Sequence, residues 1–528
     1  MADTAPHRPE QAAGEGWSDA RVTFAADGPL EGAWHAATER LERCLVAHPG
    51  RAPILHEGGI YGGAWVESTA SICCEVLARF LPGVAAETIR RVVSQPGPDG
   101  QLPYKVTPEG PSYAQIQMVT PFARSVARVA ALAADPALLA DAYPALAAHD
   151  AWLAEHRDTR GTGGVEAFCT YDTGHDRSPR FWHVPDGCPG GDATRYDRDN
   201  PRLPFVAPDL TANVAAQRLA LAGIAASLHL DPEPWRVKAA RSQRALLEQT
   251  WHDEDGTFYD RDAQGEPVRV NTDALLRVLA CGIGGDAFFD AAAERHLLNP
   301  RRFFAAFPFT SVALDDPRFD PHTAYNSWAG PTNMLAILRA PDAFEPHGRY
   351  VELGWALWPT VAALSREVRF AQTVNPWVGD QGFTSDYAPA ILALLDFVER
   401  CCGVLPRFDR TLWVTGMRAP QVQHDLPATA TSYGRDVGGR RYDLRVEGED
   451  ATLRVDGDVS AVFPAGLRLV LDAAGDLSEI VGMVARTVEG ELTWGGTTVE
   501  VAVAGNERWA WNAGRPERVA ARGVIVPR

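Results

Sequence analysis

The residues best suited to chemistry lie in one segment, residues 170–187, which is dense in aspartates, arginines and aromatic side chains. Within it, Asp172 and Asp176 are four residues apart, and Arg177 and Arg180 stand close by. Aromatic platforms beside carboxylates and arginines suit a sugar, because its ring has apolar C–H faces and hydrogen-bonding hydroxyls. Cleavage of a glycosidic bond also needs two carboxyl groups, one to donate a proton and one to act as base or nucleophile. The segment therefore predicts a carbohydrate site.

Four other segments combine aromatic residues with amides, charges and turn-forming glycines or prolines: residues 58–70, 100–117, 307–333 and 375–387. The last of these contains two further carboxylates, Asp380 and Asp386, on either side of a Gly-Phe pair. Because a rigid scaffold often presents its functional residues on loops, we expect these five segments to meet at one site.

The motifs in these segments resemble those of the inverting (α/α)6-barrel glycosidases, which include trehalases, processing α-glucosidases and bacterial mannosylglycerate and glucosylglycerate hydrolases. Residues 172–180, DTGHDRSPR, are similar to the E-S-G-x-D-x-S-x-R segment of that group. The resemblance covers roughly residues 55–400 and implies that Asp176 is the general acid.

The resemblance also implies a set of sugar-binding residues. Trp65-Val66-Glu67-Ser68 is similar to a W-x-D-S signature, with Glu in place of Asp, and residues 328–331, WAGP, resemble a W-x-G-P segment that lines the sugar pocket. Gln117 corresponds to a glutamine of a substrate loop. The predicted substrate-binding residues are Trp65, Glu67, Tyr104, Lys105, Gln117, Asp172, Arg180, Trp328, Gly330 and Gln372.

The sequence departs from this group at the general base. The base of the group is a Glu in an E-x-x-N-P-like segment, and residues 371–376, AQTVNP, place Gln372 there. An amide cannot deprotonate water at neutral pH. Either another carboxylate has taken over, with Asp380 and Asp386 the nearest in sequence, or the chemistry is not ordinary hydrolysis.

The scaffold that must position these residues is mainly α-helical. Between about residues 31 and 403, some twelve apolar stretches at helical spacing alternate with loops rich in Gly, Pro and Asp, with almost no strand signal between them. The stretch 208–229 is typical, since Leu210, Val214, Gln217 and Leu221 predict one buried face. About six helical hairpins in a row predict an (α/α)6 barrel. A helical solenoid is the alternative, but the sequence shows no repeat of fixed length, which argues against it.

After about residue 410 the apolar spacing changes to every second residue, as in Tyr442, Leu444 and Val446, which predicts a small C-terminal antiparallel β module, sandwich-like in form. We therefore expect a loose N-terminal tail at residues 1–20, the catalytic barrel at 21–408 and the β module at 409–528. The module carries no concentrated chemistry, so its predicted role is structural.

Composition narrows the class of protein. The 528 residues carry a formal net charge of -18, which argues against nucleic-acid and anionic-membrane partners. The chain has no long apolar segment or signal-like N-terminus, and its eight cysteines lack metal or redox spacing, so we expect a cytoplasmic protein without metal or cofactor. Whether it forms a homo-oligomer stays open.

These observations favour an exo-acting, inverting glycoside hydrolase that releases a glucose- or mannose-type sugar from a small soluble α-glycoside. Asp176 would be the acid, and Asp380 or Asp386 the second catalytic carboxylate. Two alternatives remain: a sugar epimerase or isomerase on the same barrel, and a carbohydrate-binding pseudoenzyme, which Gln372 favours.

Overall fold

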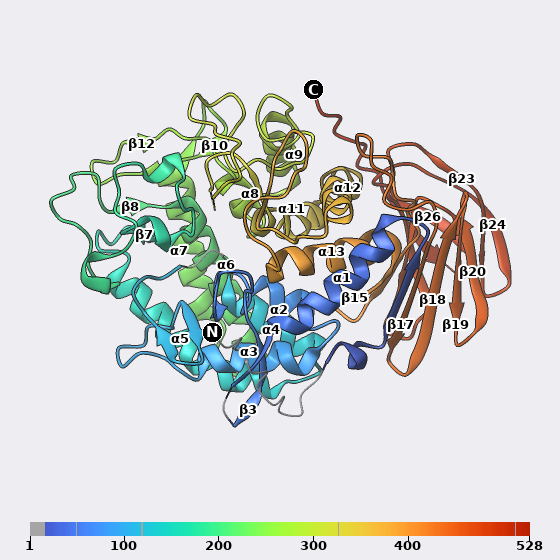
Figure 1. The fold of residues 1–528 in the computed structure, drawn as a ribbon, viewed down its shortest axis with the longest axis horizontal. Helices are drawn as coiled ribbons and strands as arrows, with labels where there is room; N and C mark the ends of the chain where they lie inside the picture. The colour runs from blue at the N-terminus through green and yellow to red at the C-terminus, as the bar shows by residue number, and fades with distance from the viewer. Residues whose placement is uncertain (1–15, 49, 118–119, 326, 513) are drawn as a thin grey trace, which may run out of the picture.

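The computed structural model describes residues 16–528 apart from 49, 118–119, 326 and 513. Helices fill the left and centre of Figure 1, and the strands of the last part of the chain stand together at the right. Most of the predicted tail lies outside the described residues. Its last part, Trp17–Ala20, forms a short 3-10 turn, and the ring of Trp17 lies 5.3 Å from that of Phe80.

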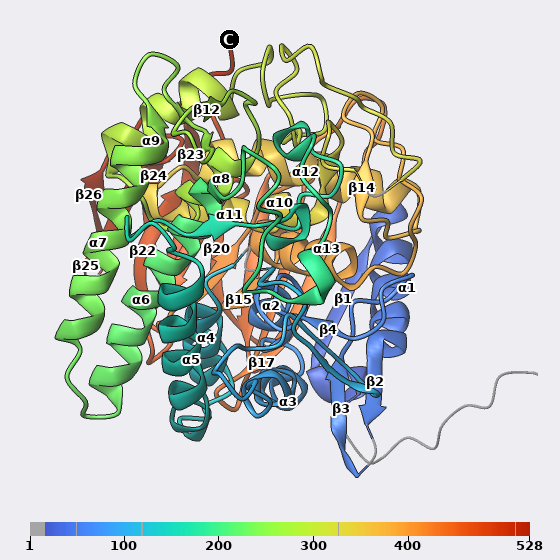
Figure 2. The same ribbon diagram turned by 90° about the vertical axis from the view of Figure 1, so that its left-hand side faces the viewer.

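Thirteen α-helices are found in the described part of the chain. They are α1 (Pro29–Cys44), α2 (Ile72–Leu77), α3 (Pro82–Val93), α4 (Phe122–Leu132), α5 (Ala137–His156), α6 (Pro208–Ser227), α7 (Glu233–Thr250), α8 (Ala274–Leu279), α9 (Asp286–Ala292), α10 (Met334–Ile337), α11 (Ala340–Phe344), α12 (Tyr350–Arg366) and α13 (Ala388–Cys402). They lie between residues 29 and 402, close to the region in which some twelve helical stretches are predicted. Figure 2 shows α4, α5, α6 and α7 side by side.

Helix α6 is buried on more than the one face that its apolar spacing predicts. Besides Leu210 and Val214, the polar residues Asp209, Asn213 and Gln217 are buried as well. α6 packs against α4, α5, α7 and α8, so it is an interior helix surrounded by others. Its polar side chains are therefore available to the loops at its N-terminal end, where the candidate site lies.

The expectation of almost no strands between the helices is wrong. Short strands pair within the loops: β2 (Leu45–His48) with β3 (Arg51–Leu55); β4 (Ala64–Trp65) with β5 (Lys105–Thr107) and β6 (Gly110–Ser112); β7 (Glu166–Ala167), β8 (Phe205–Val206), β11 (Asp260–Arg261) and β12 (Pro267–Val268) in one sheet; β9 (Trp251–His252) with β10 (Thr257–Phe258); and β13 (Thr332–Asn333) with β14 (Thr373–Val374). Strands this short have too few residues to show an alternating apolar pattern. Some of these pairs, such as β4 with β5, β8 with β11 and β13 with β14, join loops that are far apart in sequence and so hold the site segments in place.

The predicted C-terminal β module consists of two antiparallel sheets. One has the order β1-β17-β18-β19-β20-β23-β24 and the other β15-β16-β21-β22-β25-β26. The strands are β1 (Val22–Ala26), β15 (Val404–Pro406), β16 (Leu412–Thr415), β17 (Thr431–Val437), β18 (Arg440–Glu447), β19 (Asp450–Val455), β20 (Asp458–Pro464), β21 (Leu467–Leu471), β22 (Leu477–Gly482), β23 (Val488–Trp494), β24 (Thr497–Val503), β25 (Arg508–Asn512) and β26 (Arg515–Ala520). The first sheet thus gains an edge strand from the N-terminal end of the chain.

Helix α1 connects the two regions. Leu30, Ala33, Ala37 and Leu41 form its buried apolar face, and Pro29 occupies its first turn, where a missing N–H is harmless. Trp34, also buried, packs its ring 5.8 Å from that of Tyr433 on β17. α1 also packs against α12 and α13, the last helices of the chain, so the first and last helices are neighbours.

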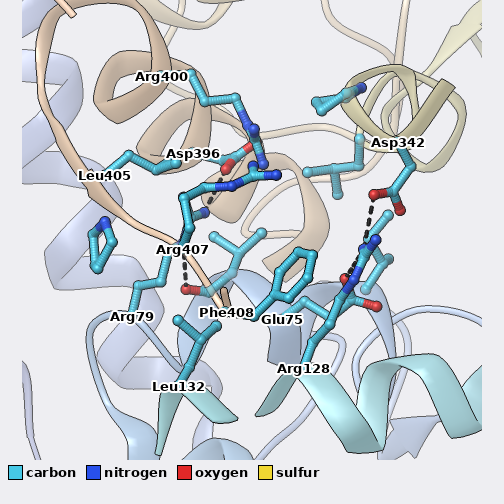
Figure 3. Close-up of a pocket in the computed structure, with 15 residues that line it drawn as sticks. Glu75, Arg79, Arg128, Leu132, Asp342, Asp396, Arg400, Leu405, Arg407 and Phe408 are labelled. Carbon is cyan, nitrogen blue, oxygen red and sulfur yellow. Dashed lines mark hydrogen bonds and ion pairs between the residues drawn. The ribbon is translucent and has the colours of Figure 1, made fainter. Parts of the chain in front are cut away.

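Buried ion pairs fasten the sheets to the helices. Arg435 on β17 pairs with Glu399 of α13 at 2.6 Å, and Arg407, after β15, pairs with Glu345 at 2.9 Å. Figure 3 shows the neighbouring cluster, where Arg79 and Arg400 both contact Asp396 beside a small cavity of about 60 Å³. Because opposite charges in this cluster are matched, we assign it a structural role.

Candidate active site

The loop that carries Asp176, residues 169–188, is held at both ends and along its length. The backbone N–H groups of Thr170 and Tyr171 donate to the carbonyls of Pro185 and Asp186, each at 3.0 Å. The N–H of Trp328 donates to the carbonyl of Asp176 at 3.0 Å, which brings residues 328–331 beside the loop, as predicted. The Asp176 side chain is half-buried at the centre of this arrangement.

Arg180 anchors the loop to the helices beneath it. Its guanidinium forms ion pairs with Asp209 of α6 at 2.9 Å and Asp260 of β11 at 2.7 Å, and it is buried. His175 lies 3.1 Å from Asp273, next to the start of α8. The prediction that Arg180 binds substrate is therefore corrected: two carboxylates occupy its donors, and it positions the loop.

Asp172 is also a structural residue. Its carboxylate receives hydrogen bonds from Arg157 at 2.5 and 3.1 Å and from the N–H groups of Ile116 and Phe168 at 3.0 and 2.8 Å. The side chain is inaccessible to solvent. Four donors satisfy both of its oxygens, so the predicted contact between Asp172 and a sugar is corrected as well.

Three carboxyl groups in this region have raised pKa values. Burial raises the pKa of Asp176 to about 7, and the charges of Glu67 and Asp186 add to the effect, while Arg177 opposes it. Burial also raises the pKa of Glu67 to about 8, helped by the charge of Glu57. The pKa of Glu57 itself reaches about 7 because it is buried, although a hydrogen bond from Ser68 lowers the value. A carboxyl with a pKa near 7 can donate or accept a proton at neutral pH.

Gln372, the residue in place of the expected base, does lie in this region. Strand β14 begins directly after it, and its carbonyl accepts a hydrogen bond from Met334 at 2.9 Å. The hydroxyl of Tyr61 donates to Oε1 of Gln372 at 2.9 Å. The rings of Tyr61 and Tyr387 are 5.9 Å apart, and the buried hydroxyl of Tyr387 lies beside the carboxyl of Glu57, where it lowers the pKa of Glu57. Two tyrosines thus connect Gln372 with Glu57.

Several predicted sugar-binding residues are brought together around Glu67. Trp65 on β4 pairs with Lys105 on β5, whose Nζ lies 4.6 Å from the Trp65 ring. The ring of Tyr104 is 5.7 Å from that of Trp65. Gln117 hydrogen-bonds Glu67 and lowers its pKa. Trp65, Tyr104, Lys105, Gln117 and Glu67 are therefore neighbours, as a sugar-binding wall requires.

Trp328 and Gly330 have a different role from the predicted one. Trp328 is only 1% exposed, and its ring packs 4.7 Å from that of His175 and 4.5 Å from the guanidinium of Arg277. A Cβ on Gly330 would lie 2.3 Å from the carbonyl oxygen of Asp320, so only glycine fits there. Both residues shape the wall behind the site, and the prediction of a direct sugar contact for Trp328 is corrected because the ring is enclosed.

The two carboxylates predicted as replacement bases point elsewhere. The Asp380 side chain is 73% exposed and pairs with Arg366 at 3.1 Å. Asp386 pairs with Arg40 of α1 at 2.9 Å, while Tyr387, the next residue, lies beside Glu57. Their closeness to Gln372 in sequence was misleading, because the turn after β14 carries Asp380 to the surface. Both catalytic assignments are corrected.

Glu57 escapes prediction from the sequence, because it directly precedes the segment 58–70 and belongs to no motif that carries chemistry by itself. Tyr387 is the last residue of the predicted site segment 375–387, but the sequence assigns it no role of its own. The glycine pair after Glu57 offers an indirect signal. Gly58 has a positive φ of 77°, and a Cβ there would lie 2.2 Å from the carbonyl oxygen of Asp386. This close approach brings Glu57 and Tyr387 together.

In the part of the chain that the structure describes, no helix has the length and apolar character needed to cross a membrane.

Solved structures of other proteins are similar to this chain in fold. No curated protein is similar enough to the chain to count as a match. The solved structure of a GH63 mannosylglycerate hydrolase from Thermus thermophilus is similar over 69% of this chain and 100% of that chain, with 19% identity and a TM-score of 0.58. A GH78 rhamnosidase of Bacillus sp. GL1 is similar over 83% of this chain and 41% of that chain, with 14% identity and a TM-score of 0.52.

These structural similarities concern the fold, since the identities are low. The family model described as the mannosylglycerate hydrolase MGH1-like glycoside hydrolase domain matches residues 61–388, which include the Asp176 loop, Trp65, Gln117 and Gln372. The resemblance to this group of glycosidases is thus confirmed. The chain belongs to the MGH1-like glycoside hydrolase family and is a glycoside hydrolase.

Proposed function

We propose that the protein is an exo-acting, inverting hydrolase of a small soluble α-glycoside with a glucose- or mannose-type sugar, and that Asp176 is its general acid. The observation that carries this proposal is the pKa of Asp176, raised to about 7 by burial and by the charge of Glu67. A carboxyl that stays partly protonated at neutral pH can protonate the leaving oxygen as the glycosidic bond breaks.

Glu57 is the proposed general base. It is the carboxyl connected with Gln372 through Tyr61 and Tyr387, and Gln372 marks the base position of the related enzymes. In an inverting enzyme the acid and base stand roughly 6.5 to 9.5 Å apart, with a water between the base and the sugar. Glu57 would remove a proton from this water while the water attacks the anomeric carbon from the face opposite Asp176. Gln372 would hold the water in place.

The sugar would lie against Trp65, with Glu67, Gln117 and Lys105 as partners for its hydroxyls. Glu57 and Glu67 are both almost inaccessible to solvent, which supports a site that is closed at its inner end. A closed end admits one terminal sugar, and this supports exo action. The protonated form of Glu67, favoured by its pKa of about 8, can donate a hydrogen bond to a hydroxyl.

The leaving group would carry a negative charge, as glycerate does. Arg177 directly follows the acid, is exposed, and stacks its guanidinium 4.4 Å from the ring of Tyr325. An arginine held over an aromatic ring keeps its donors free for a carboxylate. The Thermus relative is called a mannosylglycerate hydrolase, which agrees with this choice of substrate.

We also infer that the helices close into an (α/α)6 barrel, because α1 packs against α12 and α13. The barrel would comprise residues 21–408 and the β module residues 409–528, with β1 and β15 as two strands from the first range that join the sheets of the module. The eight cysteines are free and buried, which supports the predicted cytoplasmic location.

A carbohydrate-binding protein without turnover is the second candidate, and Gln372 is the observation that favours it. The epimerase alternative has less support. It needs a titrating histidine, and burial lowers the pKa of His175, which is enclosed by Arg180 and Asp273, to about 4.

The test is a sugar-release assay on α-glucosides and α-mannosides, including trehalose and the glycerate glycosides, with the anomer of the product followed by proton NMR. We expect a single sugar of inverted configuration, and none from Asp176→Asn. Release of the retained anomer would overturn inversion, and no release from any substrate would favour the binding protein.

A further inference from the structure

Two cysteines stand at the two ends of the 169–188 loop. The thiol of Cys188 donates to Sγ of Cys169 over 3.5 Å, and both side chains are buried in a small apolar cluster with Phe168. The hydrogen bonds from Thr170 and Tyr171 to the carbonyls of Pro185 and Asp186 hold the two ends together. Asp176 lies between them, so this pair closes the loop that carries the acid.

The sulfur atoms of Cys169 and Cys188 and a carboxylate oxygen of Asp172 lie close enough together to hold a metal ion. Arg157 argues against a metal there. Its guanidinium pairs with Asp172 and also donates to Sγ of Cys188 at 3.7 Å, so a cation already occupies the group. The Asp172 oxygens accept four hydrogen bonds and have little capacity left for an ion. What remains is the chemistry of two adjacent thiols.

The distance between the sulfurs suits a covalent bond. A disulfide needs about 2.05 Å between sulfurs, and rotation of the two side chains about their Cα–Cβ bonds can supply the approach from 3.5 Å. Cys188 is the more accessible of the two, at 6% exposed against 0% for Cys169. Cys188 is therefore the better placed of the two to react first.

We propose that Cys169 and Cys188 form a reversible disulfide that locks the loop carrying Asp176, and that a small-molecule disulfide supplies the oxidising equivalents. The thiolate of Cys188 attacks one sulfur of the small disulfide and releases one small thiol. The thiolate of Cys169 then attacks Sγ of Cys188 and releases the second. Two protein thiols and one small disulfide thus give one protein disulfide and two small thiols, and the two electrons lost by the protein reduce the small disulfide.

The consequence is control of the active site. Asp186, two residues before Cys188, raises the pKa of Asp176 by its charge, so a shift of this end of the loop changes the pKa of the acid. Disulfides of this kind in reducing compartments are usually transient and redox-sensing. The control of activity rests on the proposed acid role of Asp176, whereas formation of the bond does not.

The experiment treats the full-length protein with glutathione disulfide, and a parallel sample with dithiothreitol. Peptide mapping without reduction is expected to find Cys169 linked to Cys188, with two fewer free thiols than the eight of the reduced chain. Hydrogen exchange within residues 170–187 should slow in the oxidised protein, and the pH profile of kcat should shift and return on reduction. Cys188→Ala should abolish these changes, and Cys281→Ala, a change at a buried cysteine outside the loop, should retain them.

Three outcomes would overturn the proposal. One is recovery of both thiols after oxidation of the unaltered protein, a result that does not depend on how any variant folds. The second is a stable glutathione adduct on Cys188 without the link to Cys169. The third is a stoichiometric metal ion bound by these residues. If the disulfide forms but the protein cleaves no glycoside, the proposal of the disulfide stands and the proposed function is wrong.

Discussion

The hydroxyl of Tyr61 donates a hydrogen bond of 2.9 Å to Oε1 of Gln372. This bond fixes the side chain that the resemblance places at the position of the base, and it engages the amide oxygen of Gln372, whose other polar group is an N–H donor. An N–H donor can hold the oxygen of a water molecule but cannot take its proton. The proton acceptor must therefore be a different group, and Glu57 is the carboxyl that the two tyrosines connect to this position.

Glu57→Gln should lower kcat by about 10²–10⁴-fold, because the variant loses the proton acceptor. Gln372→Glu introduced into that variant should recover part of the activity, since Tyr61 can donate to a carboxylate as it does to the amide. Steady-state kinetics on one substrate checks both. Unchanged kcat in Glu57→Gln would contradict the assignment of the base.

The raised pKa values of Glu57, Glu67 and Asp176 predict that stability depends on pH. Each group binds its proton more tightly in the folded protein, with a pKa of about 7 or 8, than in the unfolded chain, where the value is about 4. The three protonated carboxyl groups therefore stabilise the folded state. This stabilisation is fully present below the pKa values of the unfolded chain and is lost as the pH rises through the pKa values of the folded protein.

Glu67→Gln should accordingly raise Tm at about pH 9 and leave it nearly unchanged at about pH 5, because the amide mimics the protonated acid. Scanning calorimetry at the two pH values measures this, with Glu447→Gln on the exposed face of β18 as the control. Equal destabilisation of the variant at both pH values would show that the folded protein does not raise the pKa of Glu67.

Arg177→Ala should raise KM for a glycoside with an anionic leaving group by about tenfold, the equivalent of about 1.4 kcal/mol, and leave KM for a neutral aryl glycoside unchanged. The guanidinium stacked on Tyr325 is an exposed cation next to the acid, so its loss weakens the binding of a charged leaving group alone, whereas its effect on the pKa of Asp176 is the same for both substrates. Equal effects on both substrates would assign Arg177 to the loop structure.

Arg435→Ala should destabilise the protein by about 3–5 kcal/mol, because it leaves the buried carboxylate of Glu399 without this partner. Arg445→Ala, which removes an exposed pair with Glu447 on β18, is the matched control and should change little. Urea denaturation followed by circular dichroism compares the two. Equal midpoints for both variants would show that the ion pairs do not fasten the sheets to the helices.

The helical character, the change to strands near residue 410 and the Asp176 loop could be predicted because each rests on a local pattern. The second carboxylate could not. Tyr61 and Gln372 are 311 residues apart, and their contact depends on short strands and glycine turns whose pairing is decided by the whole fold. The residue types of Asp172 and Arg180 suit a sugar, but ion pairs with Arg157, Asp209 and Asp260 satisfy these two side chains within the protein.

The central claim, that Asp176 protonates the leaving group, is tested most directly by Asp176→Asn on two glycosides of the same sugar. One has a leaving group that needs protonation and the other an activated nitrophenol that does not. We expect kcat to fall by about 10²–10⁴-fold on the first substrate and far less on the second. The fall in activity above about pH 7 should also disappear for the variant on the activated substrate. An equal loss on both substrates, or full activity on the first, would contradict the assignment of Asp176 as the acid.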